Sequence, residues 1–241
     1  MNVAARILVG SQNYRLDGPD SDYDYKLLMV PDFEDLYNYH KVDKYDLPRQ
    51  YDPEHYSVMN VMTFDKNIRG GNINALEMLF SCDQHIYNDL LANYFTFMQS
   101  LYVSGYVAIV WENFFSTFSG LIFNSLRRYN NTPKVVARAQ YFINFADYVA
   151  NHDFVVDAST WCSPQIWALP RSIRYVTGKV NDEEWYHNRL EELKASTTEK
   201  VILWRDRYPS KVHYFDDANI TLQNKMRKIV FDNMVKHYVS I

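Results

Sequence analysis

The chain has 241 residues, and 25 Lys and Arg against 29 Asp and Glu give it a formal charge of -4 at pH 7. That length suits one large domain or two small ones, and 47% hydrophobic residues with only seven Gly and eight Pro exclude a disordered or fibrous chain. The acidic balance argues against a broad basic face that coats duplex nucleic acid, and two cysteines exclude a disulfide scaffold and a four-cysteine zinc site.

Short strand-like runs dominate the first 85 residues. Arg6–Gly10, Tyr25–Val30 and Ser57–Thr63 are rich in Val, Ile, Leu or Met and are bounded by Gly, Pro or Asp. Between the second and third runs lies Asp32–Tyr56, a long segment rich in Tyr, Asp, His and Pro. We expect most of it to be an excursion outside the core.

Long segments with helical spacing follow residue 85. Apolar residues recur three and four positions apart over Gln84–Arg128, Pro133–His152 and Asp182–Tyr208, and again from Ile220 to Val235. Thr132-Pro133 is typical of a helix start, with a capping hydroxyl before a proline in the first turn. The second half is therefore predicted to be helical.

The most apolar stretch, Tyr106–Phe123, carries Glu112 and Asn113 near its middle. A membrane-spanning helix needs about 20 largely apolar residues, so a buried core helix is the better interpretation. The N-terminus lacks a secretory signal pattern. We therefore expect a soluble, cytoplasmic protein with no membrane partner.

The segment from Gly10 to Pro31 carries the chemistry. A short apolar strand ends at Gly10-Ser11, where Gly permits a tight turn and Ser offers a hydroxyl and backbone N–H groups for a phosphate. Asp22 and Asp24 follow, one residue apart, so a strand beginning there places both carboxylates on one face. Two acids on one face are costly without a cation between them, and Mg²⁺ prefers carboxylate and phosphate oxygens. Each part alone is also compatible with a solvated turn, but their order and spacing favour a phosphoryl-transfer site.

This segment, GSQNYRLDGPDSDYDYKLLMVP, together with GGNINALEMLFS (Gly70–Ser81), resembles the DNA-polymerase-beta-like nucleotidyltransferase superfamily. More narrowly, it is similar to predicted nucleotidyltransferases of bacteria and phages, including members associated with RNA repair. The likeness covers roughly residues 6–81 and continues faintly through Lys134–Val149. It implies an α+β fold, with a polymerase-beta-like core (a small mixed sheet with helices) over residues 1–85 and a helical domain packed on it over 86–241.

The resemblance also implies an activity, namely transfer of a nucleoside monophosphate from an NTP to an acceptor hydroxyl. Asp22 and Asp24 would be catalytic and would hold Mg²⁺ or Mn²⁺, while Gly10 and Ser11 would hold the triphosphate. Lys26, on the same strand face as Asp24, would balance phosphate charge. Further nucleotide contacts are expected from Tyr14, Arg15 and Ser21 in the loop and from Glu77 in the helix NINALEMLF. The acceptor, whether an RNA or DNA end, a small molecule or a protein, stays open, as does the oligomeric state, and the expected setting is a bacterial or phage-infected cell.

The sequence departs from this superfamily at one position. The superfamily generally supplies a third carboxylate from the next strand, where the present sequence places Ser57, with Asn60 nearby. Neither can act as a carboxylate base, and Glu54 would replace it only if the strand slipped by three residues. The rival expectation is therefore a catalytically impaired relative that binds nucleotide, nucleic acid or a partner protein without transfer.

Basic residues elsewhere leave two further alternatives open. Arg127, Arg128, Lys134 and Arg138 either line a phosphate-binding groove between the two halves or are ordinary helix-end charges, and the same holds for Arg171 and Arg174. The 20 tyrosines are expected to serve packing rather than base stacking, because the Tyr-rich excursion is acidic, with Tyr14 the exception.

Overall fold

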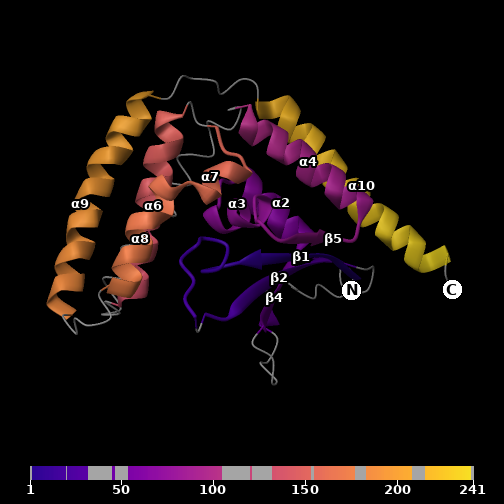
Figure 1. Cartoon of the computed structure of the whole chain (residues 1–241). Helices are drawn as coiled ribbons and strands as arrows, with labels where there is room; N and C mark the ends of the chain where they lie inside the picture. Colours follow the sequence, from indigo (N-terminus) through magenta and orange to yellow (C-terminus); the bar gives the residue numbers. More distant parts are fainter. Residues whose placement is uncertain are drawn as a thin grey trace.

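The structure, a computed structural model, describes residues 2–19, 21–31, 45–46, 54–104, 120, 132–152, 155–176, 183–207 and 215–239. A mixed sheet lies in the lower part of the view, with some helices above it and others beside it on the left (Figure 1). The sheet contains β1 (Asn2–Val9), β2 (Tyr23–Val30), β3 (Tyr45–Asp46), β4 (Glu54–Asn60) and β5 (Gln84–Ile86) in the order β3-β4-β2-β1-β5. The expected α+β class is confirmed at this level.

The central pairing of the sheet is parallel. β1 runs antiparallel to both β2 and β5, and β3 runs antiparallel to β4, but β2 and β4 are parallel, with Asp24 opposite His55 and Lys26 opposite Ser57. Parallel neighbours need a crossover connection, which explains why a long segment separates these two strands. Apart from the short β3, that segment (32–44 and 47–53) lies outside the described residues.

The third strand differs from its prediction. We expected it over Ser57–Thr63, but β4 ends at Asn60 and helix α2 (Val61–Arg69) begins directly after it. The Asn60 side chain accepts a hydrogen bond from Met62 N at 2.8 Å, which is the geometry of a helix N-cap. An apolar Val and Met at the helix start therefore looked like a continuation of the strand.

Asparagine caps also start the next two helices. Asn72 accepts from Asn74 N in front of α3 (Ile73–Leu79), and Asn88 accepts from Leu91 N in front of α4 (Asp89–Val103). The expected helix NINALEMLF is thus confirmed as α3. Of the longer helix expected over Gln84–Arg128, the first residues form β5, and most of the part beyond α4 lies outside the described residues.

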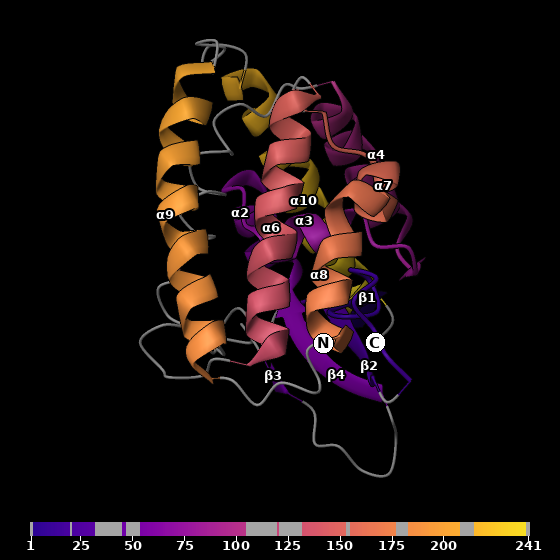
Figure 2. The same ribbon diagram turned by 60° about the vertical axis from the view of Figure 1, so that its left-hand side comes forward.

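Two helices of the second half follow their predicted ranges, Pro133–His152 and Asp182–Tyr208, closely, and the one expected from Ile220 to Val235 is longer at both ends. Thr132 caps α6 (Pro133–Asn151), with Pro133 in its first turn. After it come α7 (Ala158–Cys162), α8 (Pro164–Val176), α9 (Glu183–Arg207) and α10 (Phe215–Val239). Figures 1 and 2 show α6, α8 and α9 side by side at one end of the molecule, while α4 and α10 lie together at the other.

One hydrophobic core runs through both halves of the chain. It includes Ile7 and Leu28 from the sheet, Leu76 from α3 and Phe142 and Phe145 from α6, all at most 1% exposed. The boundary expected at residue 85 is therefore not a break in the core, since the helical half completes the burial of the sheet.

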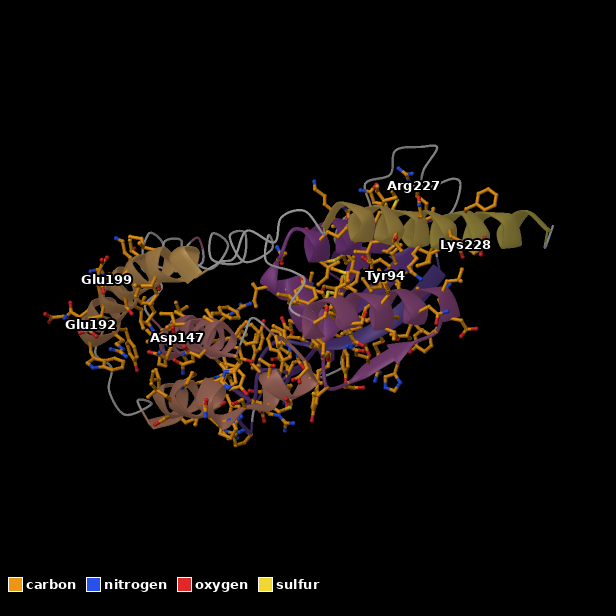
Figure 3. All side chains as sticks on the ribbon, turned by 90° about the horizontal axis from the view of Figure 1, so that it is seen from above. Tyr94, Asp147, Glu192, Glu199, Arg227 and Lys228 are labelled. Atoms are coloured by element: carbon orange, nitrogen blue, oxygen red, sulfur yellow. The ribbon has the colours of Figure 1, made fainter. Side chains whose placement is uncertain are left out.

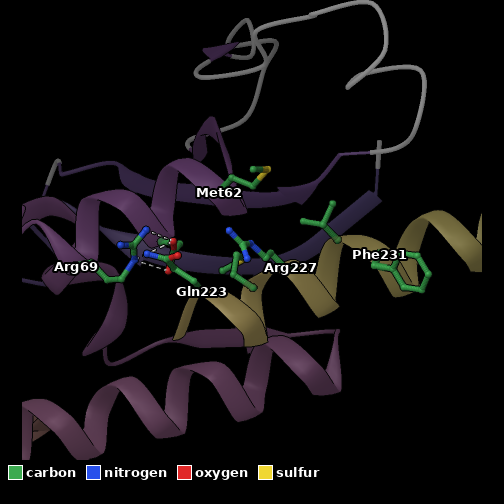
Figure 4. A pocket seen from close by; sticks show the side chains of 8 residues that line it. Met62, Arg69, Gln223, Arg227 and Phe231 are labelled. Atoms are coloured by element: carbon green, nitrogen blue, oxygen red, sulfur yellow. Dashed lines mark hydrogen bonds and ion pairs between the residues drawn. The ribbon is translucent and has the colours of Figure 1, made fainter. Parts of the chain in front are cut away.

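Helices α2, α4 and α10 meet around a buried acid. Asp65 is 5% exposed and accepts from both Arg69 (2.6 Å to Nη2) and the Tyr94 hydroxyl (2.7 Å). Figure 3 shows Tyr94 within this end of the molecule, and Figure 4 shows the Asp65–Arg69 contacts at the edge of a cavity of about 520 Å³ between α2 and α10. Met62, Met226, Val230 and Phe231 give that cavity a mainly apolar wall. Its buried acid is already paired with Arg69 and Tyr94.

No helix in the described part of the chain is long and apolar enough to cross a membrane. The apolar stretch Tyr106–Phe123, for which we expected a buried helix, lies outside the described residues except for Gly120.

We expect Tyr94→Phe to destabilise the fold by about 1.5 to 3 kcal/mol, because it removes a hydrogen bond to a buried carboxylate. Urea unfolding measures this loss. Tyr87→Phe is the matched control, since Tyr87 is 63% exposed and should stay within about 0.5 kcal/mol of the wild type. Equal stability of the two variants would show that Arg69 alone satisfies Asp65.

Candidate functional site

A polar cavity of about 330 Å³ lies where the sheet meets α3 and α6. Its lining comes from the ends of β1, β2 and β4 and from three helices, and consists of Val9, Gly10, Asp24, Lys26, His55, Ser57, Met59, Asn67, Asn72, Asn74, Glu77 and Arg138. Four of the predicted site residues, Gly10, Asp24, Lys26 and Glu77, are thus brought together. This volume is typical of a small-ligand site.

Strand β2 places an acid and a base side by side in the cavity. Asp24 and Lys26 share a face because side chains alternate along a strand. The parallel register then supplies a partner for each, with His55 Nδ1 3.2 Å from Asp24 Oδ1 and Lys26 Nζ donating to Ser57 Oγ at 2.9 Å. The cavity therefore contains a carboxylate, an ammonium group and an imidazole within two rungs of one strand pair.

Gly10 is required by its neighbour Asp24. The Gly10 φ angle is +80°, and a Cβ added there would lie 2.8 Å from Asp24 Oδ2. Backbone and carboxylate approach this closely only where no side chain intervenes. We predicted that this glycine allows a ligand to approach the backbone. In the structure the space left by its missing side chain is used by the Asp24 carboxylate.

Glu77 holds that turn from beneath. Its carboxylate accepts hydrogen bonds from Gly10 N and from the Tyr14 hydroxyl at 2.5 Å, and its own backbone oxygen accepts from Asn13 Nδ2 at 3.4 Å. The side chain is 3% exposed, and burial raises the pKa of Glu77 to about 7, against the lowering effect of Tyr14, Arg138 and Gly10. The Gly10 amide expected to hold phosphate is therefore already bonded to Glu77.

Tyr14 lies in the core and is not among the residues that line the cavity. It is 2% exposed, and its ring packs on Tyr141 (4.8 Å between centroids) and Trp161 (5.9 Å). Burial, with the nearby Glu77 carboxylate, raises the Tyr14 pKa well above its ordinary value. Tyr141 is also buried, as expected for packing tyrosines.

Arg138 brings a second cation to the cavity from α6. Its guanidinium carbon lies 5.5 Å from the centre of the Phe142 ring and 5.9 Å from that of Tyr14, and its Nη2 is 3.5 Å from Asn74 Oδ1. Of the four basic residues that were expected to line a phosphate-binding groove, Arg138 lines the cavity. Lys134 is exposed and is not among the lining residues, while Arg127 and Arg128 lie outside the described residues.

The remaining loop residues surround the turn without lining the cavity. Ser11 O accepts from Leu16 N at 2.9 Å, and Arg15 has a left-handed φ of 59° with its Nη2 3.8 Å from Cys162 Sγ. Ser21 Oγ accepts from Gly18 N at 2.9 Å, and Asp22 is half-buried directly before β2. The loop is therefore held both by its own hydrogen bonds and by contacts from α3, α7 and α8.

The position expected for a third carboxylate is occupied by other groups. Ser57 lines the cavity but bonds to Lys26, and Glu54 pairs in register with Tyr23, while its side chain lies outside the described part of the structure. The residue opposite Asp24 is His55, which was not a predicted site residue. His55 could have been found from the sequence only by assuming the parallel pairing of the two strands. When His55–Ser57 is aligned in parallel beside Asp24–Lys26, His55 lies opposite Asp24.

Among the described residues, no group of three or more His, Cys, Asp and Glu is arranged to hold a metal ion. Mg²⁺ generally keeps several waters and binds one or two carboxylates together with substrate phosphates, so it does not need such a group. Asp24 lines the cavity and meets this smaller requirement, whereas Asp22 lies directly before β2 and is not among the lining residues. The residues present are compatible with a metal that enters together with a phosphate ligand.

No family model matches the chain, and no curated protein matches it. The assignment of the cavity therefore depends on its own geometry, which combines Asp24 with two cationic side chains behind a glycine turn.

We expect Glu77→Gln to change the pH dependence of stability. Because burial raises the Glu77 pKa from 4.5 to about 7, the folded protein holds a proton at pH 5 to 6 that the unfolded chain has already lost. Stability from this group is complete at low pH and declines as pH rises through 7, so the wild type should lose roughly 2 to 3 kcal/mol relative to the variant between pH 5 and pH 8.

Urea unfolding at pH 5, 6, 7 and 8 measures this difference. Glu199→Gln, an exposed change on α9, serves as the control and should follow the wild type at every pH. A stability difference between wild type and Glu77→Gln that is constant across the range would contradict a buried, titrating Glu77.

Proposed function

We propose that the chain is a metal-dependent nucleotidyltransferase that moves a nucleoside monophosphate from an NTP to an acceptor hydroxyl, with pyrophosphate as the leaving group. The observation that carries this proposal is the convergence of Asp24, Lys26 and Arg138 in one cavity behind the Gly10 turn. Phosphoryl transfer depends mainly on positioning and on neutralising charge, and these side chains supply both signs of charge at one place. The resemblance of the Gly10–Pro31 segment to polymerase-beta-like enzymes points the same way.

In this proposal Asp22 and Asp24 would hold Mg²⁺ or Mn²⁺, which would supply neutralisation of phosphate charge. Lys26, from the sheet, and Arg138, from α6, would both face the NTP phosphates, because both line the cavity. Glu77 acts through Gly10, because it fixes the turn that brings Asp24 into the cavity. Its role is to position the turn rather than to touch the nucleotide.

His55 takes the place of the missing third carboxylate. If its Nδ1 donates to Asp24 Oδ1, the ring is fixed and Nε2 serves as the proton acceptor for the incoming hydroxyl. Histidine is the most common side chain in this role, so the absence of an acid at Ser57 does not by itself prevent transfer.

The parallel register of β2 and β4 also favours a second candidate function, namely ligand binding without transfer. Lys26 Nζ already donates to Ser57 Oγ, so the strand that would carry the third acid instead satisfies the cation of β2. An arrangement of this kind suits a protein that binds a nucleotide or another phosphate ligand without transferring it. The two functions differ in whether the nucleoside monophosphate of a bound NTP is transferred to an acceptor.

The first test offers each α-³²P-labelled NTP with Mg²⁺ or Mn²⁺ to pooled RNA, DNA and protein acceptors. The wild type should transfer label, and Asp22→Ala should abolish transfer. Asp24→Asn should weaken metal-dependent NTP binding at least tenfold while leaving the melting temperature unchanged or raised, because it removes one of two neighbouring acids. Nucleotide binding without transfer under any condition would establish the second function, and a large loss of stability in Asp24→Asn would make the acid pair structural.

The second test separates His55 from its neighbours. His55→Ala should reduce the transfer rate by about 10²-fold or more and leave NTP affinity within about threefold, as expected when a general base is removed. His85→Ala is the matched control, because His85 is a more exposed histidine at the far edge of the sheet. A transfer rate unaffected by His55→Ala would assign the proton to another acceptor.

A further inference from the structure

A second cleft, of about 410 Å³, lies on the other side of the 11–22 loop. Its loop wall includes Gly18, and its helix wall is the face of α8 that carries Trp167, Arg171 and Tyr175. These three side chains are four residues apart and therefore follow one another along one stripe of the helix. Figure 2 shows α8 beside α6, with its C-terminal end directed toward the β1–β2 part of the sheet.

The two aromatic rings of this cleft are fixed in place. Trp167 Nε1 donates to Cys162 O at 3.0 Å, and the Tyr175 hydroxyl donates to Leu16 O at 2.8 Å. Tyr175 lies so close to the loop that a Cβ at Gly18 would be 2.7 Å from its ring. Tyr175 is nevertheless 41% exposed, so an oriented aromatic surface faces solvent.

Cations accompany both rings. The Arg171 guanidinium lies 5.9 Å from the Trp167 ring centre, and that of Arg174 lies 5.7 Å from the Tyr175 ring centre. The α8 sequence contains these two arginines and no acidic residue. The chain as a whole carries a net charge of -4, whereas this stripe of α8 is positively charged. On the loop wall Asp17 adds one carboxylate, which is suited to accept a hydrogen bond from a base amino group.

The stripe leads toward the acids of the candidate site. Arg174 Nη2 is 3.5 Å from Ser21 Oγ, and Ser21 immediately precedes Asp22. At 1.5 Å per residue, the seven residues from Trp167 to Arg174 extend about 10 Å along the helix. A ligand lying along α8 would therefore end beside the loop that leads into β2.

We propose that this face of α8 binds the end of a single-stranded nucleic acid, with bases against Trp167 and Tyr175 and phosphates against Arg171 and Arg174. Oriented aromatic rings alternating with arginines are the elements that hold single strands without reading their sequence. That this strand is also the acceptor of nucleotidyl transfer rests on the proposed function. The binding of the strand to α8 is independent of the proposed function.

The test uses fluorescence anisotropy of the full chain with 5′-fluorescein-labelled 12-mers of mixed sequence, one RNA and one DNA. Trp167→Ala should weaken binding about tenfold, in the range expected for loss of one stacked base. Arg171→Gln should weaken binding and lower the slope of log affinity against log salt by about one. Trp167→Phe should restore most of the affinity, which a merely misfolded variant would not do.

Trp185→Ala is the control, because Trp185 is an exposed indole on α9 that does not line the cleft, and this variant should bind as the wild type does. Binding of either oligonucleotide with this variant pattern supports the proposal, and the preferred strand identifies the sugar. Failure of both oligonucleotides to bind, or equal binding by wild type, Trp167→Ala and Arg171→Gln, overturns it.

ATP binding in the presence of Mg²⁺ is measured by equilibrium dialysis on the same samples. If ATP binds and oligonucleotides do not, the α8 site is wrong and the proposed function stands. If oligonucleotides bind as expected but no ATP binds and no label is transferred, the strand site stands and the nucleotidyltransferase proposal fails.

Discussion

The candidate site depends on one buried carboxylate. Glu77 comes from α3, yet it bonds to the backbone of Gly10 and to the hydroxyl of Tyr14, two positions on the loop that follows β1. Through Gly10 it sets how closely the turn approaches Asp24, and through Tyr14 it connects the turn to the aromatic core on α6 and α7. An acid that is costly to bury is tolerated here because several donors converge on it. The shape of the cavity follows from this one contact.

Local patterns were sufficient to predict α6, α9 and the middle of α10, whereas α7 and α8 were not predicted as separate helices. The start of α6 could be read from Thr132-Pro133, and α9 lies within one residue of its expected limits at each end. They failed at the end of β4, where the choice between strand and helix depended on whether Asn60 capped a helix. Apolar residues at a helix start and at a strand end look alike in sequence, so the capping contact decided the boundary.

The candidate site was predictable in part for a related reason. Gly10, Asp24 and Lys26 lie within one short segment whose turn and strand period could be inferred from the residues alone, and the structure places all three in the cavity. Other features of the site depend on partners 31 to 67 residues away in the sequence. These are the hydrogen bonds of Tyr14 and of the Gly10 amide to Glu77, and the contact of His55 with Asp24. No local spacing encodes such partners, because they follow from strand register and helix packing.

The contacts between α8 and the loop after β1 also bear on the order in which the protein becomes functional during its synthesis. Arg171, Arg174 and Tyr175 contact loop residues that precede them by 153 to 159 positions. During synthesis these loop residues leave the ribosome well before α8, because α8 follows them so much later in the sequence. A nascent or truncated chain ending before α8 would thus lack the contacts that this helix makes with Arg15, Leu16 and Ser21. The loop in front of β2 would gain its full set of contacts only once α8 has been made.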